Sequence, residues 1–319
     1  MAELIERGST LHKLGSGAVW AEGPVWVAET RTCRFSDIPG NRILQFSEVT
    51  GELTVYRDGV GFTNGRTLDL DGSVVQCSHG GRRMERDRGG VVEEVVSSWS
   101  GARFNSPNDV VVKSDGTIWF TDPSYGIQKA GEGYPGELEY GDHYVFRFDP
   151  RDGSVRPVVI DVEMPNGLAF SPDESVLYVA DSGISPPDGV RDAGRPGGHS
   201  IHRYDVFDGR KCKNGREFVE VNPGLPDGFR VDEAGNVWTS SHDSVQVFDP
   251  DGRPVERVPV PEKIANVCFG GDDGRTLYIT ATTSLYRIRT TVRDAAAVLR
   301  GVGSGVSSGV SSGVGGAAS

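Results

Sequence analysis

Six segments of the chain begin with the same kind of residue and reach a turn at the same distance. Each begins with one carboxylate or carboxamide side chain, followed by a short apolar run: Glu22, Asn64, Asn108, Asn166, Asp227 and Asn266. In five segments a turn residue lies eight positions further on: Gly72, Gly116, Glu174, Gly235 and Gly274. A second apolar run follows each of these turns. The pattern therefore predicts a repeated hairpin of two buried strands.

The spacing of the six starting residues predicts the fold. They are separated by 42, 44, 58, 61 and 39 residues along the chain. Repeats of about 40–50 residues with several short strands are typical of β-propeller blades. A second type of hairpin, with alternating polar and apolar residues, alternates with the first, for example at residues 43–46 and 53–56. We expect an all-β fold, a six-bladed β-propeller with four-stranded antiparallel blades around a central channel.

The domain organisation follows from the same repeat. We expect residues 1–299 to form a single propeller domain, with insertions at residues 125–142 and 183–199 that lengthen two of the repeats. Part of the segment 11–19 is expected to supply the outer strand of the last blade and so close the ring. Residues 292–299 are expected to form a short helix. Apart from Arg300, residues 300–319 are only Gly, Val, Ser and Ala, which predicts a flexible tail.

The composition excludes several classes of protein. The chain has 319 residues, a net charge of −12 and a mean hydropathy of −0.34. An acidic chain repels phosphate backbones, so we expect no nucleic-acid partner. No stretch is long enough to span a bilayer and the first residues lack an apolar export region, so we expect no membrane partner and a cytoplasmic location. The four cysteines form no C-x-x-C pair. The oligomeric state is left open.

The six starting residues are candidates for a metal site. Taken alone, Asn or Asp beside Pro or Gly is an ordinary turn former. Recurrence at the start of every inner strand, however, would place these side chains around the mouth of the channel. A set of oxygen ligands suits a hard cation such as Ca²⁺ or Mg²⁺. Glu22 and Asp227 would offset the charge of the cation, and Asn166 and Asn108 would add amide oxygens.

Further polar residues are candidates for contact with a substrate. Four of them end the second strand of their unit, 14 or 15 residues after its start: Asp37, His79, Asp122 and Asp181. Turn chemistry and a role in a pocket explain these positions equally well. His79 is the most interesting of the four, because Gly80, Gly81 and two arginines follow it. Arg103 could face an anionic or hydroxyl-rich substrate, although an ordinary surface arginine is the simpler interpretation.

Several segments, in the same order along the chain, resemble one known family. They are AEGPVW at 21–26, FSDIPGNR at 35–42, SPNDVVV at 106–112, FTDP at 120–123, NGLAFSPD at 166–173 and PDG at 226–228. Together they resemble the gluconolactonase, regucalcin (senescence marker protein) and luciferin-regenerating-enzyme family, and bacterial gluconolactonases above all. The resemblance runs from about Leu14 to Arg289.

The resemblance implies a divalent cation at the channel mouth of a six-bladed propeller. It implies Glu22, Asn166 and Asp227 as metal ligands, with Asn108 in contact with the metal or the substrate. Ca²⁺ is the expected ion, and Zn²⁺, Mg²⁺ and Mn²⁺ are alternatives. Arg103 is placed like an arginine that regucalcin uses for its substrate. Extra residues separate it from Asn108, so Asn105 competes for the role of Asn108, although the eight-residue offset favours Asn108.

The expected function is metal-dependent opening of a small-molecule sugar lactone, similar to gluconolactone, to the hydroxy acid. The cation would polarise the carbonyl, and Asp227 would act as general base or as nucleophile. Asn108, with Arg103 and His79, would contact the sugar. Two alternatives remain open: a phosphotriesterase or arylesterase acting at the same site, and a non-catalytic calcium-binding propeller.

Overall fold

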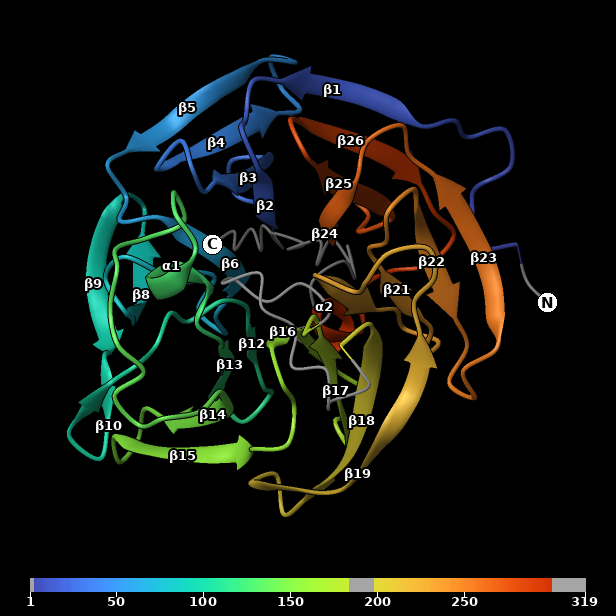
Figure 1. Cartoon of the computed structure of the whole chain (residues 1–319). Coiled ribbons are helices and arrows are strands. Elements are labelled where there is room, and N and C mark those ends of the chain that lie inside the picture. The colour runs from blue at the N-terminus through green and yellow to red at the C-terminus, as the bar shows by residue number, and fades with distance from the viewer. Residues whose placement is uncertain (1–2, 184–197, 300–319) are drawn as a thin grey trace, which may run out of the picture.

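The computed structural model describes residues 3–183 and 198–299. Within these residues, six antiparallel sheets of four strands each stand around a central channel (Figure 1), which confirms the predicted six-bladed propeller. In each blade the chain runs from the channel outward. The first three blades are β2 (Ala21–Val27), β3 (Thr32–Asp37), β4 (Arg42–Ser47) and β5 (Leu53–Asp58); β6 (Thr63–Leu68), β7 (Val74–Ser78), β8 (Arg83–Arg88) and β9 (Val91–Val96); and β12 (Val110–Val112), β13 (Ile118–Asp122), β14 (Tyr144–Asp149) and β15 (Ser154–Val159).

The second half of the ring repeats the arrangement. Its blades are β16 (Pro165–Phe170), β17 (Val176–Asp181), β18 (Ser200–Phe207) and β19 (Lys211–Glu220); β20 (Phe229–Val231), β21 (Val237–Thr239), β22 (Ser244–Phe248) and β23 (Pro254–Pro259); and β24 (Ile264–Gly270), β25 (Thr276–Ala281) and β26 (Ser284–Arg289) with β1 (His12–Ser16). A two-stranded hairpin, β10 (Ser98–Trp99) with β11 (Ala102–Arg103), lies between the second and third blades.

The two ends of the propeller sequence meet in the sixth blade, where β1 is the outermost strand. His12 pairs with Arg287 and Ser16 with Ser284, in the sheet order β1-β26-β25-β24. The expected contribution of the segment 11–19 is therefore confirmed. Because β1 is hydrogen-bonded to β26, it covers the edge that β26 would otherwise expose and closes the ring.

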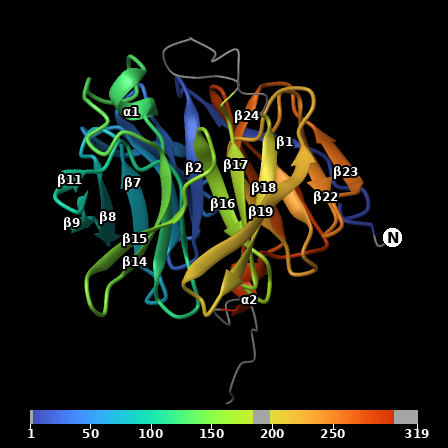
Figure 2. The same ribbon diagram turned by 60° about the horizontal axis from the view of Figure 1, so that its bottom comes forward.

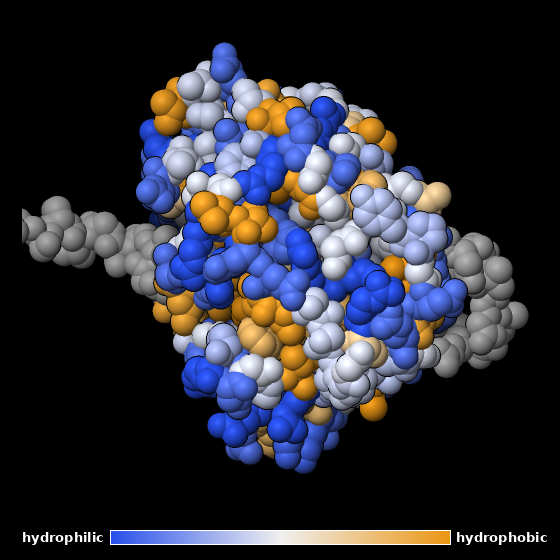
Figure 3. All heavy atoms as spheres, turned by 90° about the vertical axis from the view of Figure 1, so that its left-hand side faces the viewer, coloured by the Kyte–Doolittle hydropathy of each residue, from blue (hydrophilic) through white to orange (hydrophobic). Residues whose placement is uncertain are grey.

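The hydrophobic core lies between neighbouring blades and near the channel. Every residue of β2, β3, β7 and β13 is buried, whereas most residues of the outer strands β5 and β9 are partly or fully exposed. The outer side of the ring, where β9 and β10 lie, accordingly shows charged and polar side chains with scattered hydrophobic ones between them (Figure 3). The predicted contrast between apolar inner and half-solvated outer hairpins follows from this geometry.

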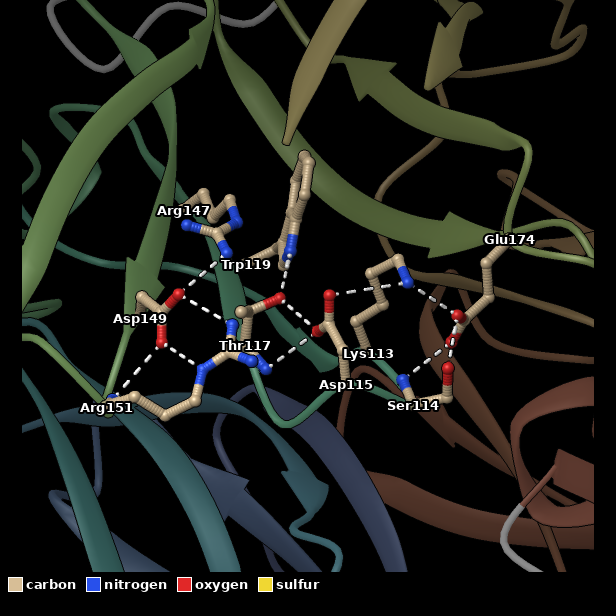
Figure 4. A network of polar contacts seen from close by, with 9 residues as sticks. All are labelled: Lys113, Ser114, Asp115, Thr117, Trp119, Arg147, Asp149, Arg151 and Glu174. Atoms are coloured by element: carbon tan, nitrogen blue, oxygen red, sulfur yellow. Dashed lines mark hydrogen bonds and ion pairs between the residues drawn. The ribbon is translucent and has the colours of Figure 1, made fainter. Parts of the chain in front are cut away.

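Polar side chains join neighbouring blades at the ends of their inner hairpins (Figure 4). Buried Trp119 donates its indole N–H to Thr117 Oγ1 over 2.9 Å, and Thr117 donates to Asp115 Oδ1 over 2.7 Å. Lys113 Nζ lies 2.8 Å from Oε2 of Glu174, which belongs to the β16–β17 turn of the next blade. The network satisfies the indole and ties the third blade to the fourth.

The two ends of the channel carry different elements (Figure 2). Helix α1 (Tyr125–Gln128) belongs to the β13–β14 connection at one end, and helix α2 (Ala295–Leu299) lies at the other. Helix α2 falls within the predicted segment 292–299. Most of the predicted insertion at 183–199 and all of the tail 300–319 lie outside the described residues.

None of the described helices has both the length and the apolar character needed to cross a bilayer.

Candidate active site

A pocket of about 150 Å³ opens at the α1 end of the channel, and four of the predicted site residues line it. They are Glu22, Asn108, Asn166 and Asp227, which come from the first, third, fourth and fifth blades. Residues up to 205 positions apart in the sequence thus meet around one small volume. Asn64, from the second blade, also lines the pocket.

A second cavity, of about 340 Å³, lies at the α2 end of the channel. Its walls are mainly apolar, with Trp26, Phe170 and Phe269 among them, and none of the four predicted residues lines it. A catalytic or metal site needs convergent polar groups as well as volume. The smaller pocket is therefore the candidate active site.

Backbone irregularities turn the starting residues toward the channel mouth. The pairing of β2 with β3 shifts register between Glu22 and Val25, and the pairing of β16 with β17 shifts between Pro165 and Leu168. Equivalent shifts occur at the starts of β6 and β24. An extra residue in one strand of a ladder bends that strand and re-aims its side chains. In four of the six blades the starting residue therefore lies at a bulge, whereas Asn108 and Asp227 lie just before their inner strands.

Glycines beside the starting residues allow the blades to approach closely at the axis. Gly65 N donates to Asn108 O over 2.8 Å, and Gly167 N donates to Asp227 O over 2.9 Å. A Cβ atom on Gly167 would lie only 2.4 Å from Asp227 O. The Asn–Gly and Asp–Gly pairs that look like turn chemistry in the sequence therefore serve close inter-blade packing.

Two of the three carboxylates that line the pocket, Glu22 and Asp227, influence each other electrostatically. Glu22 Oε2 accepts hydrogen bonds from Gly23 N and from Asn266 Nδ2, the latter over 3.0 Å. Burial raises the pKa of Glu22 well above its usual range, and the negative charges of Asp227 and Asp109 raise it further. Burial also raises the pKa of Asp227 to about 6. Two acidic groups held this way have a strong electrostatic need for a compensating cation.

The two asparagines supply oxygens without adding charge. Asn108 and Asn166 are both buried, and among the described residues neither side-chain amide has a hydrogen-bond partner in the protein. Both side chains line the pocket, so their amides are available to a ligand there. Across the described ranges no cluster of three or more His, Cys, Asp or Glu side chains is arranged to hold a metal. A cation here would therefore need the amide oxygens.

Two other predicted residues lie outside the pocket lining. The structure does not bring Arg103 into the pocket, because its side chain is 66% exposed and its Nε lies 2.6 Å from Glu139 Oε1. His79 is fully buried behind the pocket wall, with Nδ1 2.9 Å from Glu132 O and Nε2 3.2 Å from Asn64 Nδ2. Burial lowers the pKa of His79. In this position His79 holds two lining residues, Asn64 and Glu132.

Asn105 and Asn108, the two candidates for one role at the site, occupy different positions relative to the pocket. Asn105 Nδ2 donates to the backbone oxygens of Asp122 and Asp142, over 3.0 and 2.9 Å, and Asn105 does not line the pocket. Asn108 lines it, as the eight-residue offset indicates.

The acidic residues at the strand ends have structural roles. Asp37 Oδ1 accepts from the backbone N–H groups of Val19 and Trp20, over 2.7 and 3.2 Å. Asp122 likewise accepts from the segment before its own inner strand, and so does Asp181. None of the three lines the pocket. Each of these carboxylates therefore holds the segment that leads into its own inner strand, and the structure gives them no contact with the pocket.

A layer of polar residues below the pocket was not predicted. Asn266 Nδ2 lies 3.4 Å from Asp109 Oδ2 as well as 3.0 Å from Glu22 Oε2. Arg230 Nη1 lies 3.7 Å from the same Asp109 oxygen, and Arg230 Nη2 lies 3.4 Å from Arg66 O. Arg230 thus links its own fifth blade to the third and the second. Asn266 could be identified from its position in the repeat, whereas Asp109 and Arg230 belong to no comparable sequence pattern.

The rim of the pocket comes from loops. Lys129 and Glu132 follow α1 in the β13–β14 connection, with 2.5 Å between Nζ and Oε1. Lys263 precedes β24, and its Nζ lies 5.2 Å from the centroid of the Trp20 ring. No sequence pattern connects Lys263 with Lys129 and Glu132, since their loops belong to different blades.

Comparison with known proteins places the chain in one family. The profile described as "SMP-30/Gluconolactonase/LRE-like region" matches residues 20–283. A gluconolactonase of Zymomonas mobilis is 30% identical, over 90% of this chain and 83% of that protein. The pentonolactonase XacC of Haloferax volcanii is 31% identical, over 81% of this chain and 80% of that protein. The protein described here belongs to the SMP-30/gluconolactonase/LRE-like family, as its sequence motifs indicate.

A solved structure agrees with this assignment. The crystal structure of a gluconolactonase from Xanthomonas campestris is 36% identical to this chain and superposes with a TM-score of 0.81. The match covers 91% of each chain.

Proposed function

We propose that this protein hydrolyses a sugar lactone to the corresponding hydroxy acid at the α1 end of the channel. The observation that carries the proposal is the convergence of Glu22, Asn108, Asn166 and Asp227 on one pocket. Relatives named gluconolactonase and pentonolactonase, which align with most of the chain, support the reaction class.

The four residues fit a hard divalent cation, and Ca²⁺ is the ion we propose. The donor set contains two carboxylates with raised pKa values and two buried asparagines whose side-chain amides have no partner in the described part of the chain. Such an all-oxygen set with two negative charges matches the preferences of Ca²⁺ more closely than those of Zn²⁺. When bound, the cation would supply Lewis-acid polarisation of the lactone carbonyl.

The chain's own residues would carry out the remaining steps. Asp227 is partly exposed to the pocket, and its backbone N–H donates to Ser240 Oγ over 2.8 Å, which helps to fix the residue. From there its carboxylate either removes a proton from the attacking water or attacks the carbonyl carbon itself. Asn108 and Asn64 would donate to hydroxyl groups of the sugar. Arg103 and His79 are left out of the direct contacts, because neither lines the pocket.

The substitution Asp227→Asn tests the proposal. Asparagine keeps the shape of the side chain but cannot take up a proton, so turnover of D-glucono-1,5-lactone should fall by about a hundredfold or more, with the fold intact. Asp251→Asn, at an exposed turn, is the matched control and should keep wild-type turnover. Wild-type hydrolysis by Asp227→Asn, measured above the spontaneous rate, would refute the assignment.

Assays on the same purified protein distinguish a lactonase from the two alternative functions. A phosphotriesterase or arylesterase would show a higher kcat/KM for a phosphotriester or aryl ester than for any lactone. A non-catalytic calcium-binding propeller would show a melting temperature that depends on Ca²⁺ and no turnover on either panel. A lactone panel assayed with EDTA, and again with each divalent ion restored, identifies the metal.

A further inference from the structure

We infer that the lactone opened at this site carries an anionic substituent, and that Lys129 and Lys263 bind it. The inference rests on the proposed lactonase function and names the class of its substrate. That class is sugar lactones bearing a phosphate, sulfonate or carboxylate group at the end of the molecule remote from the reacting carbonyl.

The first observation is the placement of the two lysines. Both line the pocket, one from the β13–β14 connection of the third blade and the other from the connection into the sixth blade. These two blades lie opposite each other in the six-bladed ring (Figure 1), and the pocket that both lysines line opens at its α1 end. Only six of the chain's 33 basic residues are lysines, and two of those six meet here.

The second observation is the charge of the pocket. Its lining contains three carboxylates, Glu22, Glu132 and Asp227, and the two lysines, which gives a formal charge of −1. The divalent cation of the proposed function changes that charge to +1. An overall acidic protein would then present a local positive site, and such a site selects anions at short range.

The third observation is that the two lysine ammonium groups make different contacts within the protein. Lys129 Nζ lies 2.5 Å from Glu132 Oε1, so this charge is largely matched within the protein. Among the described residues Lys263 forms no ion pair, and its ammonium instead lies 5.2 Å from the centroid of the Trp20 ring. The Lys263 ammonium therefore has donors available for an anion, while Trp20 offers an aromatic face to the sugar ring.

The positions of these groups predict how the substrate is oriented in the pocket. The reacting groups converge from the inner strands, whereas both lysines come from loops at the rim. A lactone with its carbonyl toward Glu22 and Asp227 would direct its far substituent toward Lys263. A lysine carries a compact charge with three rotatable donors, which suits the tetrahedral oxygens of a phosphate or sulfonate.

Steady-state kinetics on matched lactones test the inference. We would compare kcat/KM for D-glucono-1,5-lactone with that for its 6-phosphate and for its 6-sulfonate, at low ionic strength with Ca²⁺. The wild type should prefer the anionic lactones by about tenfold or more. Lys263→Met should lower the ratio of anionic to neutral kcat/KM by about tenfold through KM, and Lys263→Arg should restore part of it. Added salt should weaken the preference.

A matched control lies elsewhere on the ring. Lys213, on β19, also has its ammonium over an aromatic ring, 5.3 Å from the centroid of Phe207, but it does not line the pocket. Lys213→Met should leave the ratio at the wild-type value. An unchanged ratio in both Lys263→Met and Lys129→Met would overturn the inference. Against the effect of burial, the positive charges of Lys263 and Lys129 lower the pKa of Asp227. An equal loss on the neutral and the anionic lactone would also overturn the inference, because the lysines would then act only through that carboxylate.

A binding measurement keeps the two proposals distinguishable. If no lactone is hydrolysed, the proposed function fails, and calorimetric binding of 6-phospho-D-gluconate then tests the lysines on their own. Binding that weakens about tenfold in Lys263→Met supports the anion site, and equal binding by the variant and the wild type refutes it.

Discussion

Asn266 donates its side-chain amide to Glu22 across the seam between the sixth and first blades, with 3.0 Å between Nδ2 and Oε2. The Asn266 Oδ1 atom accepts from Val267 N over 2.8 Å, which fixes the orientation of the amide. The same Nδ2 also lies 3.4 Å from Asp109 Oδ2. One asparagine therefore orients the carboxylate that we propose as a metal ligand and joins it to the polar layer below.

Replacing this asparagine should weaken metal binding. Outer hydrogen-bond partners of ligating carboxylates typically contribute tenfold or more to metal affinity, so Asn266→Ala should raise the Kd for Ca²⁺ by about tenfold. Titration calorimetry measures the change. Asn236→Ala removes a comparable hydrogen bond to Asp232, remote from the site, and should leave the Kd unaltered. An unaltered Kd in Asn266→Ala would show that Glu22 needs no such support.

Close packing at the axis should make Gly228 intolerant of any side chain. A Cβ atom there would lie 1.9 Å from Asn266 Cγ, so Gly228→Ala must displace the amide that holds Glu22. We expect a loss of about 3 kcal/mol in unfolding free energy, together with weaker Ca²⁺ binding. Chemical denaturation provides the measurement. Gly136→Ala, where the nearest atom is Arg82 Nη1 at 3.0 Å, should cost far less. Similar losses in both variants would argue against a special role for the axial contact.

Metal binding should depend on pH in a defined direction. Burial raises the pKa of Glu22 well above its usual range and raises the pKa of Asp227 to about 6. Asp227 therefore takes up a proton as the pH falls toward and below 6, and Glu22 keeps its proton to a higher pH than an ordinary glutamate does. These protons compete with the cation. The apparent Ca²⁺ affinity should fall steeply below pH 6.

The same shifts predict how Ca²⁺ affects stability. The two carboxyls bind protons more tightly in the folded protein than in the unfolded chain, so their contribution favours the metal-free fold at low pH and opposes it at high pH. The rise in melting temperature caused by Ca²⁺ should thus be larger at pH 8 than at pH 5. Asp227→Asn should reduce the difference between the two pH values. Equal shifts at both pH values in the wild type would contradict the predicted proton competition.

Arg230 should matter for stability, because its guanidinium links three blades beneath the site. Arg230→Met leaves buried Asp109 without its cation, 3.7 Å away in the wild type. Breaking a buried pair in this way typically costs about 3 kcal/mol or more. Chemical denaturation should show that loss, and Arg230→Met combined with Asp109→Asn should recover part of it. The exposed Arg210→Met is the control. A loss no larger than that of the control would mean that the pair contributes little.

Much of the fold was predictable because the same sequence pattern recurs in each blade of a propeller. The spacing of the six starting residues predicts six blades, and the position of residues 11–19 ahead of the first inner strand predicts that part of them completes the last blade, where β1 lies. The resemblance to one family, supported by ordered motifs, predicts the same fold and the residues that line the mouth. Glu22, Asn108, Asn166 and Asp227 do line one pocket. Their chemical roles remain our proposals.

The residues that sequence reasoning misplaced are those whose neighbours come from other elements. Arg103 was a candidate for substrate contact, but a carboxylate on the insertion, Glu139, holds its side chain at the surface. His79 ends a strand like the other candidates, and its burial behind Asn64 depends on the loop that supplies Glu132. No local pattern encodes such partners.

The repeat can be read from the amino-acid sequence alone, and with it the number of blades and the side chain at the start of each inner strand. These features are local, since strand periodicity and turn residues act over a few positions. The folded chain brings several of the starting residues into one pocket, places two lysines in its lining, and lets Asn266 and Arg230 link the blades below it. Those relationships depend on the distances between blades, which close packing at the axis sets and which no single segment contains.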